Sequence, residues 1–246
     1  IGFLNEPKAI WHTIYDQEDL IGSYSQEQAH YRLDAEDVTN SAIHNANRLF
    51  GTYLTAVASS RLVDKYPELV FRVPFVRKIF PDAKFVFLVR NGWDTCQSID
   101  GWSKRLGTNV EDDTHDWWGV NNRKWHLLVD QIVATNPELK GNLATIKNYS
   151  DHTAMAAVEW ILTMQEGLKI VKQFPDNVYL LKYEDLVGQP KDSLKELLDF
   201  CELPNDKKMF SYAEQTLQSR PSYQKFALPP EITPIFEQTM TELGYD

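Results

Sequence analysis

The sequence predicts an α/β fold, because apolar runs typical of buried parallel strands are each followed by sequence with helical spacing. FVFLV (85–89) is a continuous run of branched and aromatic residues, as in a central strand that is covered on both faces. VYLLKY (178–183) is a second such run, and the helical segment SLKELLDFC (193–201) comes after it. Strand and helix therefore alternate along the chain.

The other expected elements follow from the same patterns and from proline positions. In chain order they are a strand at 1–5 (IGFLN), a region with helical spacing from Gln26 to about Ser60, a strand from Arg61 to Lys65, a helix opened by Pro67 and interrupted at Pro74, a turn at 80–84 (FPDAK), an aromatic-rich insertion, a long helical segment from about Thr153 to Phe174, and a terminal helix from Ile232 to Leu243.

Composition limits the class of protein. The chain has 246 residues, and no Gly/Ser-rich or Pro-rich linker divides it, so we expect a single domain over 1–246. The formal net charge of −10 argues against nucleic acid as a partner. Cys96 and Cys201 are too few for a disulfide framework, which favours a reducing, cytoplasmic location. No membrane span is visible. Because the sequence opens inside a strand at Ile1, we expect an upstream segment, in which a signal or anchor has room.

FVFLVRNGWDTCQS (85–98) predicts a strand, a turn and a helix start that together bind an anion. Ligands of open α/β sheets bind beyond the carboxyl ends of strands, where helix N-termini present free backbone N–H groups. Arg90 stands at such an end, and Ser98 follows it by eight residues. A guanidinium fork and a hydroxyl around one point suit a phosphate dianion.

Spacing alone leaves an alternative open, in which Arg90 pairs with Asp94 and Ser98 is an ordinary helix-face serine. Two further strand ends favour the phosphate site. Lys65 ends one expected strand and Glu6 follows another, and each lies close before a proline. Either residue alone is explained as a solvated turn residue, but three ionisable groups at three strand ends suggest one shared rim.

The sequence around these residues resembles the sulfotransferases that use 3′-phosphoadenosine 5′-phosphosulfate (PAPS), in particular bacterial members and the Golgi tyrosylprotein sulfotransferases. The resemblance implies a P-loop NTPase-like central parallel sheet flanked by helices. It also implies transfer of a sulfuryl group to an acceptor hydroxyl or amine, with 3′-phosphoadenosine 5′-phosphate (PAP) as the product. The similar segments are FLNEPKAIW (3–11), LVDKYPELVFRVPFVRKIFPDAKFVFLVRNGWDTCQSI (62–99), KYEDLVGQP (182–190), and LPPEI with LGYD within 228–246.

The resemblance also implies a role for five residues. It assigns Arg90 and Ser98 to the 3′-phosphate of the cofactor, and Tyr183 to the neighbourhood of its adenine. Glu6 resembles the general base of the tyrosylprotein branch, and Lys65 resembles the lysine that contacts the transferring group and the leaving oxygen. Such chemistry needs a base and a cation but no metal, and the six histidines form no HxxxH or His/Cys pattern that would bind one.

The chain departs from the family pattern at four places. The first phosphate loop would lie upstream of Ile1, so we expect an N-terminally truncated sulfotransferase domain with the first strand absent. No histidine follows Lys65, which favours Glu6 as the base. Trp102 stands where the tyrosylprotein branch has a basic residue, with Lys104 and Arg105 as substitutes. The glycine-rich basic loop of the cytosolic branch is missing, and Arg220 or Lys225 is the expected replacement.

Two other functions remain open at this point. A nucleotide or small-molecule kinase on a similar sheet would use Asp64 or Asp94 for magnesium, and a non-catalytic nucleotide-binding module would need neither base nor metal. The acceptor is a small molecule, a carbohydrate or a peptide, bound by loops within 12–60 and 102–150. Tryptophans in the second region stack on an acceptor or pack in the core; they are Trp117, Trp118 and Trp125.

Overall fold

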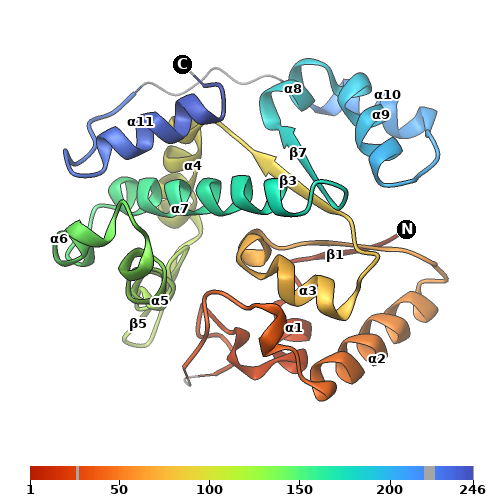
Figure 1. Cartoon of the computed structure of the whole chain (residues 1–246), viewed down its shortest axis with the longest axis horizontal. Helices are drawn as coiled ribbons and strands as arrows, with labels where there is room; N and C mark the ends of the chain where they lie inside the picture. Colours follow the sequence, from red (N-terminus) through yellow and green to blue (C-terminus); the bar gives the residue numbers. More distant parts are fainter. Residues whose placement is uncertain (26–27, 219–224, 246) are drawn as a thin grey trace. The chain divides into compact units, whose positions relative to one another are not determined.

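The computed structural model describes residues 1–25, 28–218 and 225–245 (Figure 1). The chain divides into two compact units. Unit 1 comprises Ile1–Pro81 and Trp102–Tyr149, and unit 2 comprises Asp82–Gly101 and Ser150–Asp246. The single domain expected over 1–246 stays a prediction.

Unit 1 contains a pair of parallel strands, β1 (Gly2–Asn5) and β2 (Leu62–Lys65), with Asn5 opposite Lys65 in the register. Its first half also contains α1 (Lys8–Ile14), α2 (Asn40–Ala56), a 3₁₀ helix, η3 (Pro67–Arg72), and α3 (Val73–Ile79). The strands, the break before Pro74 and the turn at 81–82 are where the sequence predicts them.

The helical region predicted from Gln26 is wrong over residues 28–34, which are not helical; a 3₁₀ helix, η2 (Ala35–Asp37), follows them, and α2 begins at Asn40. Residues 26 and 27 lie outside the described residues. Thr39 caps α2 by accepting a hydrogen bond from the N–H of Ala42, 3.0 Å away. Part of the preceding segment is bound to residues far along the chain. The N–H of Tyr31 donates to the side chain of Gln131 at 2.7 Å, and the N–H of Leu33 donates to the carbonyl of Phe71 at 3.2 Å.

The aromatic insertion forms an antiparallel sheet that the sequence analysis missed. Its strands are β4 (Thr108–Val110), β5 (Asp113–Asp116) and β6 (Gly119–Val120), and α5 (Arg123–Gln131) and α6 (Leu143–Lys147) follow them. Trp118 and Trp125 are fully buried here with their rings 5.7 Å apart, so packing accounts for both.

Unit 2 contains the parallel pair β3 (Phe85–Val89) and β7 (Val178–Lys182), with Val89 opposite Lys182. The long helix α7 (His152–Gln173) packs on both strands and on α11 (Thr233–Glu242) (Figure 1). The other helices are α4 (Gly92–Leu106), whose last residues belong to unit 1, α8 (Tyr183–Gly188), α9 (Pro190–Phe200) and α10 (Lys207–Thr216).

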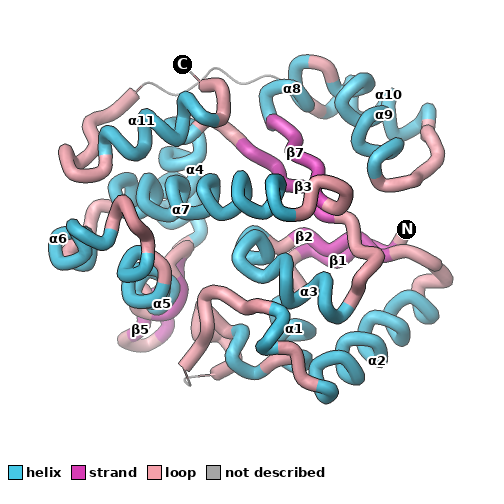
Figure 2. Tube along the Cα trace, in the orientation of Figure 1, coloured by secondary structure: helices cyan, strands magenta, loops and turns pink. Residues whose placement is uncertain are grey.

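The apolar run at 85–89 predicted a strand covered on both faces, and this prediction is wrong for β3. Phe87 and Val89 are buried, but Val86 and Leu88 are 41% and 50% exposed. Among the described residues β3 pairs only with β7, so the parallel strands form two separate pairs (Figure 2). No helix in the described part of the chain is both long enough and apolar enough to cross a membrane.

Candidate functional site

Strand β1 ends in a sharp turn at Glu6. The Glu6 N–H continues the pairing by donating to the Lys65 carbonyl at 2.8 Å. Pro7 then adopts an inverse γ-turn, with φ −78° and ψ 56°, and the Lys8 N–H donates to the Glu6 carbonyl at 2.7 Å. Glu6 itself has φ of 51°, a left-handed conformation that costs on the order of 1–3 kcal/mol in a residue other than glycine. Backbone strain of this kind gathers at functional sites.

The turn brings Glu6 and Lys65 into contact, as their positions at neighbouring strand ends predict. The Lys65 ammonium donates a hydrogen bond to the Glu6 carboxylate, while the side chains stay 56% and 35% exposed. An exposed ion pair contributes only about 0.2–1 kcal/mol. Both groups are therefore able to rearrange around a ligand at little cost, and their proposed catalytic roles stay predictions.

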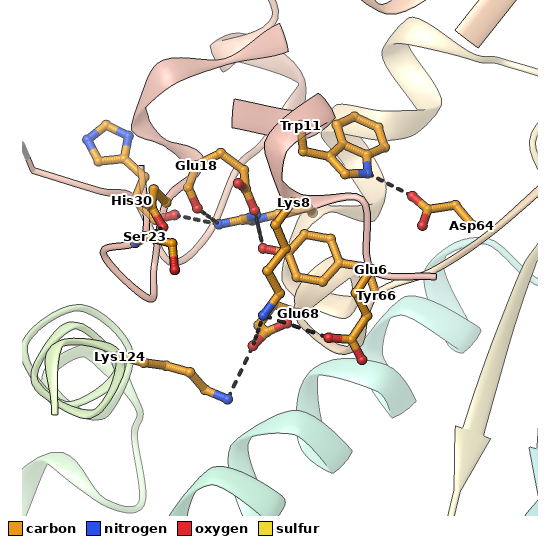
Figure 3. Close-up of polar contacts among 12 residues, drawn as sticks. Glu6, Lys8, Trp11, Glu18, Ser23, His30, Asp64, Tyr66, Glu68 and Lys124 are labelled. Atoms are coloured by element: carbon orange, nitrogen blue, oxygen red, sulfur yellow. Dashed lines mark hydrogen bonds and ion pairs between the residues drawn. The ribbon is translucent and has the colours of Figure 1, made fainter. Parts of the chain in front are cut away.

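A charge cluster that sequence reasoning missed, in which Glu68 and Lys124 are buried, lies beside Glu6 (Figure 3). Lys8 Nζ is 3.9 Å from a carboxylate oxygen of Glu6 and 3.9 Å from one of Glu68, and Lys124 Nζ is 3.2 Å from the same Glu68 oxygen. Burial alone would raise the pKa of Glu68, but Lys124 and Lys8 hold it at about 2. Lys124 also lies 4.3 Å from the ring of Trp117. The cluster fixes the start of α1 next to Glu6.

Both residues that flank Lys65 in sequence are anchored by hydrogen bonds. Asp64 accepts a hydrogen bond from Trp11 Nε1 at 2.7 Å, and burial, to which Glu6 adds, raises the pKa of Asp64 to about 6. The Tyr66 hydroxyl donates to the buried Glu18 carboxylate, which Arg72 also binds at 2.5 Å. These anchors fix the backbone that presents Lys65.

Unit 2 contains the residues predicted to bind phosphate. Arg90 lies just past β3, and its guanidinium carbon is 4.9 Å from the ring centroid of Tyr183. Arg90 Nη2 is also 3.6 Å from Asp94 Oδ2, which is the pair expected by the alternative interpretation of the spacing. Ser98 is exposed on α4, one turn beyond Asp94. The structure brings Arg90 and Tyr183 together, and phosphate binding by Arg90 and Ser98 stays a prediction.

The expectation of free backbone N–H groups at the start of α4 is wrong. Protein groups already accept hydrogen bonds from all four N–H groups of this turn. The pairs are Asn91 with Glu184 Oε1 at 3.0 Å, Gly92 with Met240 Sδ at 3.2 Å, and Trp93 and Asp94 with Asn91 Oδ1 at 2.9 and 3.4 Å. An anion at this turn must therefore be bound by side chains.

The remaining candidates are less informative. Lys104 and Arg105 are exposed in the last turn of α4, and the ring centroids of Trp102 and Trp117 are 5.8 Å apart. Lys225 is exposed, and Arg220 lies outside the described residues.

With this geometry in view, comparison with known proteins defines the class. The model of the sulfotransferase family matches residues 12–140, more than half of the chain and a stretch that includes Lys65, Arg90 and Ser98. The chain belongs to the sulfotransferase family. Both the predicted family and the predicted α/β fold are thereby confirmed, and sulfuryl transfer is favoured over a kinase activity.

Particular relatives are distant. The chain is 25% identical over 168 residues to omega-hydroxy-beta-dihydromenaquinone-9 sulfotransferase Stf3 of Mycobacterium bovis and of Mycobacterium tuberculosis, a match that covers 67% of the chain and 35% of Stf3. It is 27% identical over 154 residues to an uncharacterized protein of Aquifex aeolicus, which covers 62% of the chain and 15% of that protein. The chain thus spans about a third of the length of Stf3 and a smaller share of the Aquifex aeolicus protein.

A solved structure supports the fold. The sulfotransferase domain from the curacin biosynthetic pathway aligns with a TM-score of 0.50 at 14% identity, and the match covers 100% of this chain and 98% of that domain. At this level of identity the match is evidence for the fold alone.

Proposed function

We propose that the chain transfers a sulfuryl group from PAPS to an acceptor hydroxyl or amine. The observation that carries the proposal is the contact between Glu6 and Lys65 at the ends of two paired parallel strands, in a chain of the sulfotransferase family. A carboxylate and an ammonium in contact are the two groups that the reaction needs.

Glu6 and Lys65 act on opposite ends of the reaction. As the acceptor oxygen or nitrogen attacks sulfur, Glu6 takes up the proton that the acceptor loses. The bond between sulfur and the bridging oxygen breaks, and that oxygen leaves with its electron pair on PAP. Lys65 stabilises the charge that grows on this oxygen. The weak, exposed pair of Glu6 and Lys65 separates as the substrates enter.

Three further residues are proposed to bind the donor. Arg90 and Ser98 bind the 3′-phosphate, and Tyr183 lies near the adenine. Arg90 has donors enough for a bidentate contact with a phosphate in addition to its contact with Asp94, which is 3.6 Å long. Since the N–H groups at the start of α4 are occupied, the affinity for the 3′-phosphate depends on the Arg90 side chain.

The acceptor is proposed only as a class. The name of the relative Stf3 specifies a hydroxylated menaquinone, which supports a hydroxyl acceptor here. The small number of cysteines in the sequence supports the proposed cytoplasmic location.

Calorimetry and a transfer assay test the proposal on the full-length protein. We expect PAP to bind, and Arg90→Ala to weaken that binding by at least tenfold. With labelled PAPS and a panel of alcohol, phenol and amine acceptors, Glu6→Gln should lower kcat by about 10²–10⁴-fold while the affinity for PAP stays unchanged. The absence of PAP binding, or an unchanged affinity in Arg90→Ala, would contradict the assignment. Transfer from ATP with magnesium would instead indicate a kinase.

A further inference from the structure

The peptide group between Arg90 and Asn91 is held from both sides by distant side chains of unit 2. Trp160 Nε1 donates a hydrogen bond to the Arg90 carbonyl at 3.1 Å, and the Asn91 N–H donates to Glu184 Oε1 at 3.0 Å. Both atoms belong to one planar peptide group, so these two hydrogen bonds fix the orientation of that plane. The direction in which Arg90 leaves the backbone depends on it.

Glu184 is in turn held by the end of the chain. The Tyr245 hydroxyl donates to Glu184 Oε2 at 2.7 Å, so each oxygen of this carboxylate has its own partner. Burial, together with Glu184, raises the pKa of Tyr245 well above its ordinary value, so the hydroxyl remains protonated and able to donate.

The position of Tyr245 is itself well determined. Gly244 has φ of 71°, which ends α11 in the left-handed conformation that glycine favours, and the Tyr245 N–H donates to the Met240 carbonyl at 2.9 Å. Lys182 Nζ lies 4.9 Å from the Tyr245 ring centroid and 3.5 Å from the Gly244 carbonyl oxygen. A tyrosine held in this way connects the end of the chain to the turn that follows β3.

We infer that Tyr245 and Glu184 are positioning residues for Arg90, so that the segment after α11 forms part of the 3′-phosphate site. The inference rests on the proposed function. Tyr183 contacts the Arg90 guanidinium and the adjacent Glu184 binds the peptide that follows Arg90, so one turn of α8 holds both the side chain and the backbone of this arginine. Tyr245 stabilises that turn through its hydrogen bond to Glu184.

The test uses two nucleotides that differ only in the 3′-phosphate, PAP and adenosine 5′-phosphate, titrated calorimetrically into the full-length protein. Tyr245→Phe removes the hydroxyl and keeps the ring. We expect it to weaken PAP binding by about two- to tenfold, the effect of one lost hydrogen bond, and to leave the affinity for adenosine 5′-phosphate unchanged. Glu184→Gln should have the same selective effect. Tyr212→Phe, at an exposed tyrosine on α10, is the matched control and should alter neither affinity.

The outcomes separate this inference from the proposed function. If the unmodified protein prefers PAP but Tyr245→Phe binds it as tightly as the unmodified protein does, Tyr245 is not a positioning residue. If Tyr245→Phe lowers the affinity for both nucleotides by the same factor, the role of Tyr245 is general stabilisation of the fold, which also overturns the inference. If the unmodified protein does not distinguish PAP from adenosine 5′-phosphate, the proposed 3′-phosphate site fails first.

Discussion

Replacing Asp64 with asparagine is expected to stabilise the protein at neutral pH and to remove part of the pH dependence of its stability. Asp64 is partly buried near the end of β2, where one carboxylate oxygen accepts the hydrogen bond from Trp11. The other oxygen, Oδ1, is buried and has no hydrogen-bond partner among the described residues. Burial therefore raises the pKa of Asp64 from 3.8 to about 6, and the nearby charge of Glu6 adds to the rise.

The sign follows from proton binding in the two states. Between pH 3.8 and about 6, folded Asp64 retains a proton that the unfolded chain has lost, so the free energy of unfolding falls as pH rises through this window. Because each pKa unit corresponds to about 1.4 kcal/mol, the full effect is on the order of 3 kcal/mol. The contribution is complete below pH 3.8 and is lost above the folded pKa.

Denaturant unfolding of the unmodified protein and of Asp64→Asn, at fixed ionic strength from pH 4 to pH 8, measures this effect. Asparagine mimics the protonated carboxyl, so the two proteins should have similar free energies of unfolding near pH 4. The variant should be more stable by on the order of 3 kcal/mol above pH 7. Asp112→Asn, at an exposed turn, is the control. A difference that is independent of pH, or one that grows toward low pH, would refute the reasoning.

Two further substitutions test the packing of each unit. Glu68→Gln removes the charge that the buried Lys124 and the partly buried Lys8 share, so it should lower the free energy of unfolding by about 3–5 kcal/mol. A loss below about 1 kcal/mol in denaturant unfolding would show that these lysines do not depend on the Glu68 charge. Gly167→Ala places a Cβ 1.9 Å from a ring atom of Phe87, so it should cost about 1–3 kcal/mol through overpacking. At Gly141 the added Cβ meets no heavy atom of the described residues within 4 Å apart from its chain neighbours, so Gly141→Ala should be close to neutral. Equal effects of the two alanines would contradict the packing argument.

The strands were predictable because their signal is local. FVFLV has no polar residue and is followed by Arg90, and β3 covers the same five residues. Predicting its surroundings required information that the run does not contain. An apolar residue at every position is compatible with two buried faces, and the exposure of Val86 and Leu88 depends on which elements lie nearby.

The helical prediction before Asn40 failed for a related reason. Helical spacing shows that a segment is able to form hydrogen bonds within a helix. Partners far along the chain compete for the same backbone groups. Gln131 is such a partner, since its side chain accepts from the Tyr31 N–H and donates to the Ala29 carbonyl, both at 2.7 Å. No local pattern around Tyr31 contains that information.

In the candidate site, too, the residues with a local sequence signal were predictable and those defined by distant contacts were not. Glu6 and Lys65 were predictable because each stands at a strand end shortly before a proline, and parallel strands bring their carboxyl ends together. Glu68 and Lys124 are far apart in sequence and have the appearance of ordinary charged helix residues. Their significance comes from burial, which the sequence does not express.

Arg90 shows that the two interpretations of its spacing do not exclude each other. Asp94 and Ser98 follow it at four-residue intervals, so the helix that carries Ser98, the proposed phosphate ligand, also places a carboxylate oxygen 3.6 Å from the guanidinium. That contact involves Nη2, whereas Nε is buried without a hydrogen-bond partner among the described residues. A pair with Asp94 alone leaves this donor unsatisfied, at a cost of about 1–3 kcal/mol.

With its ring partner Tyr183 and its fixed peptide, Arg90 is already oriented, so an anion that reached it would bind without ordering a free side chain. The pair with Asp94 is therefore compatible with preorganisation of a phosphate site, and it is not evidence against one.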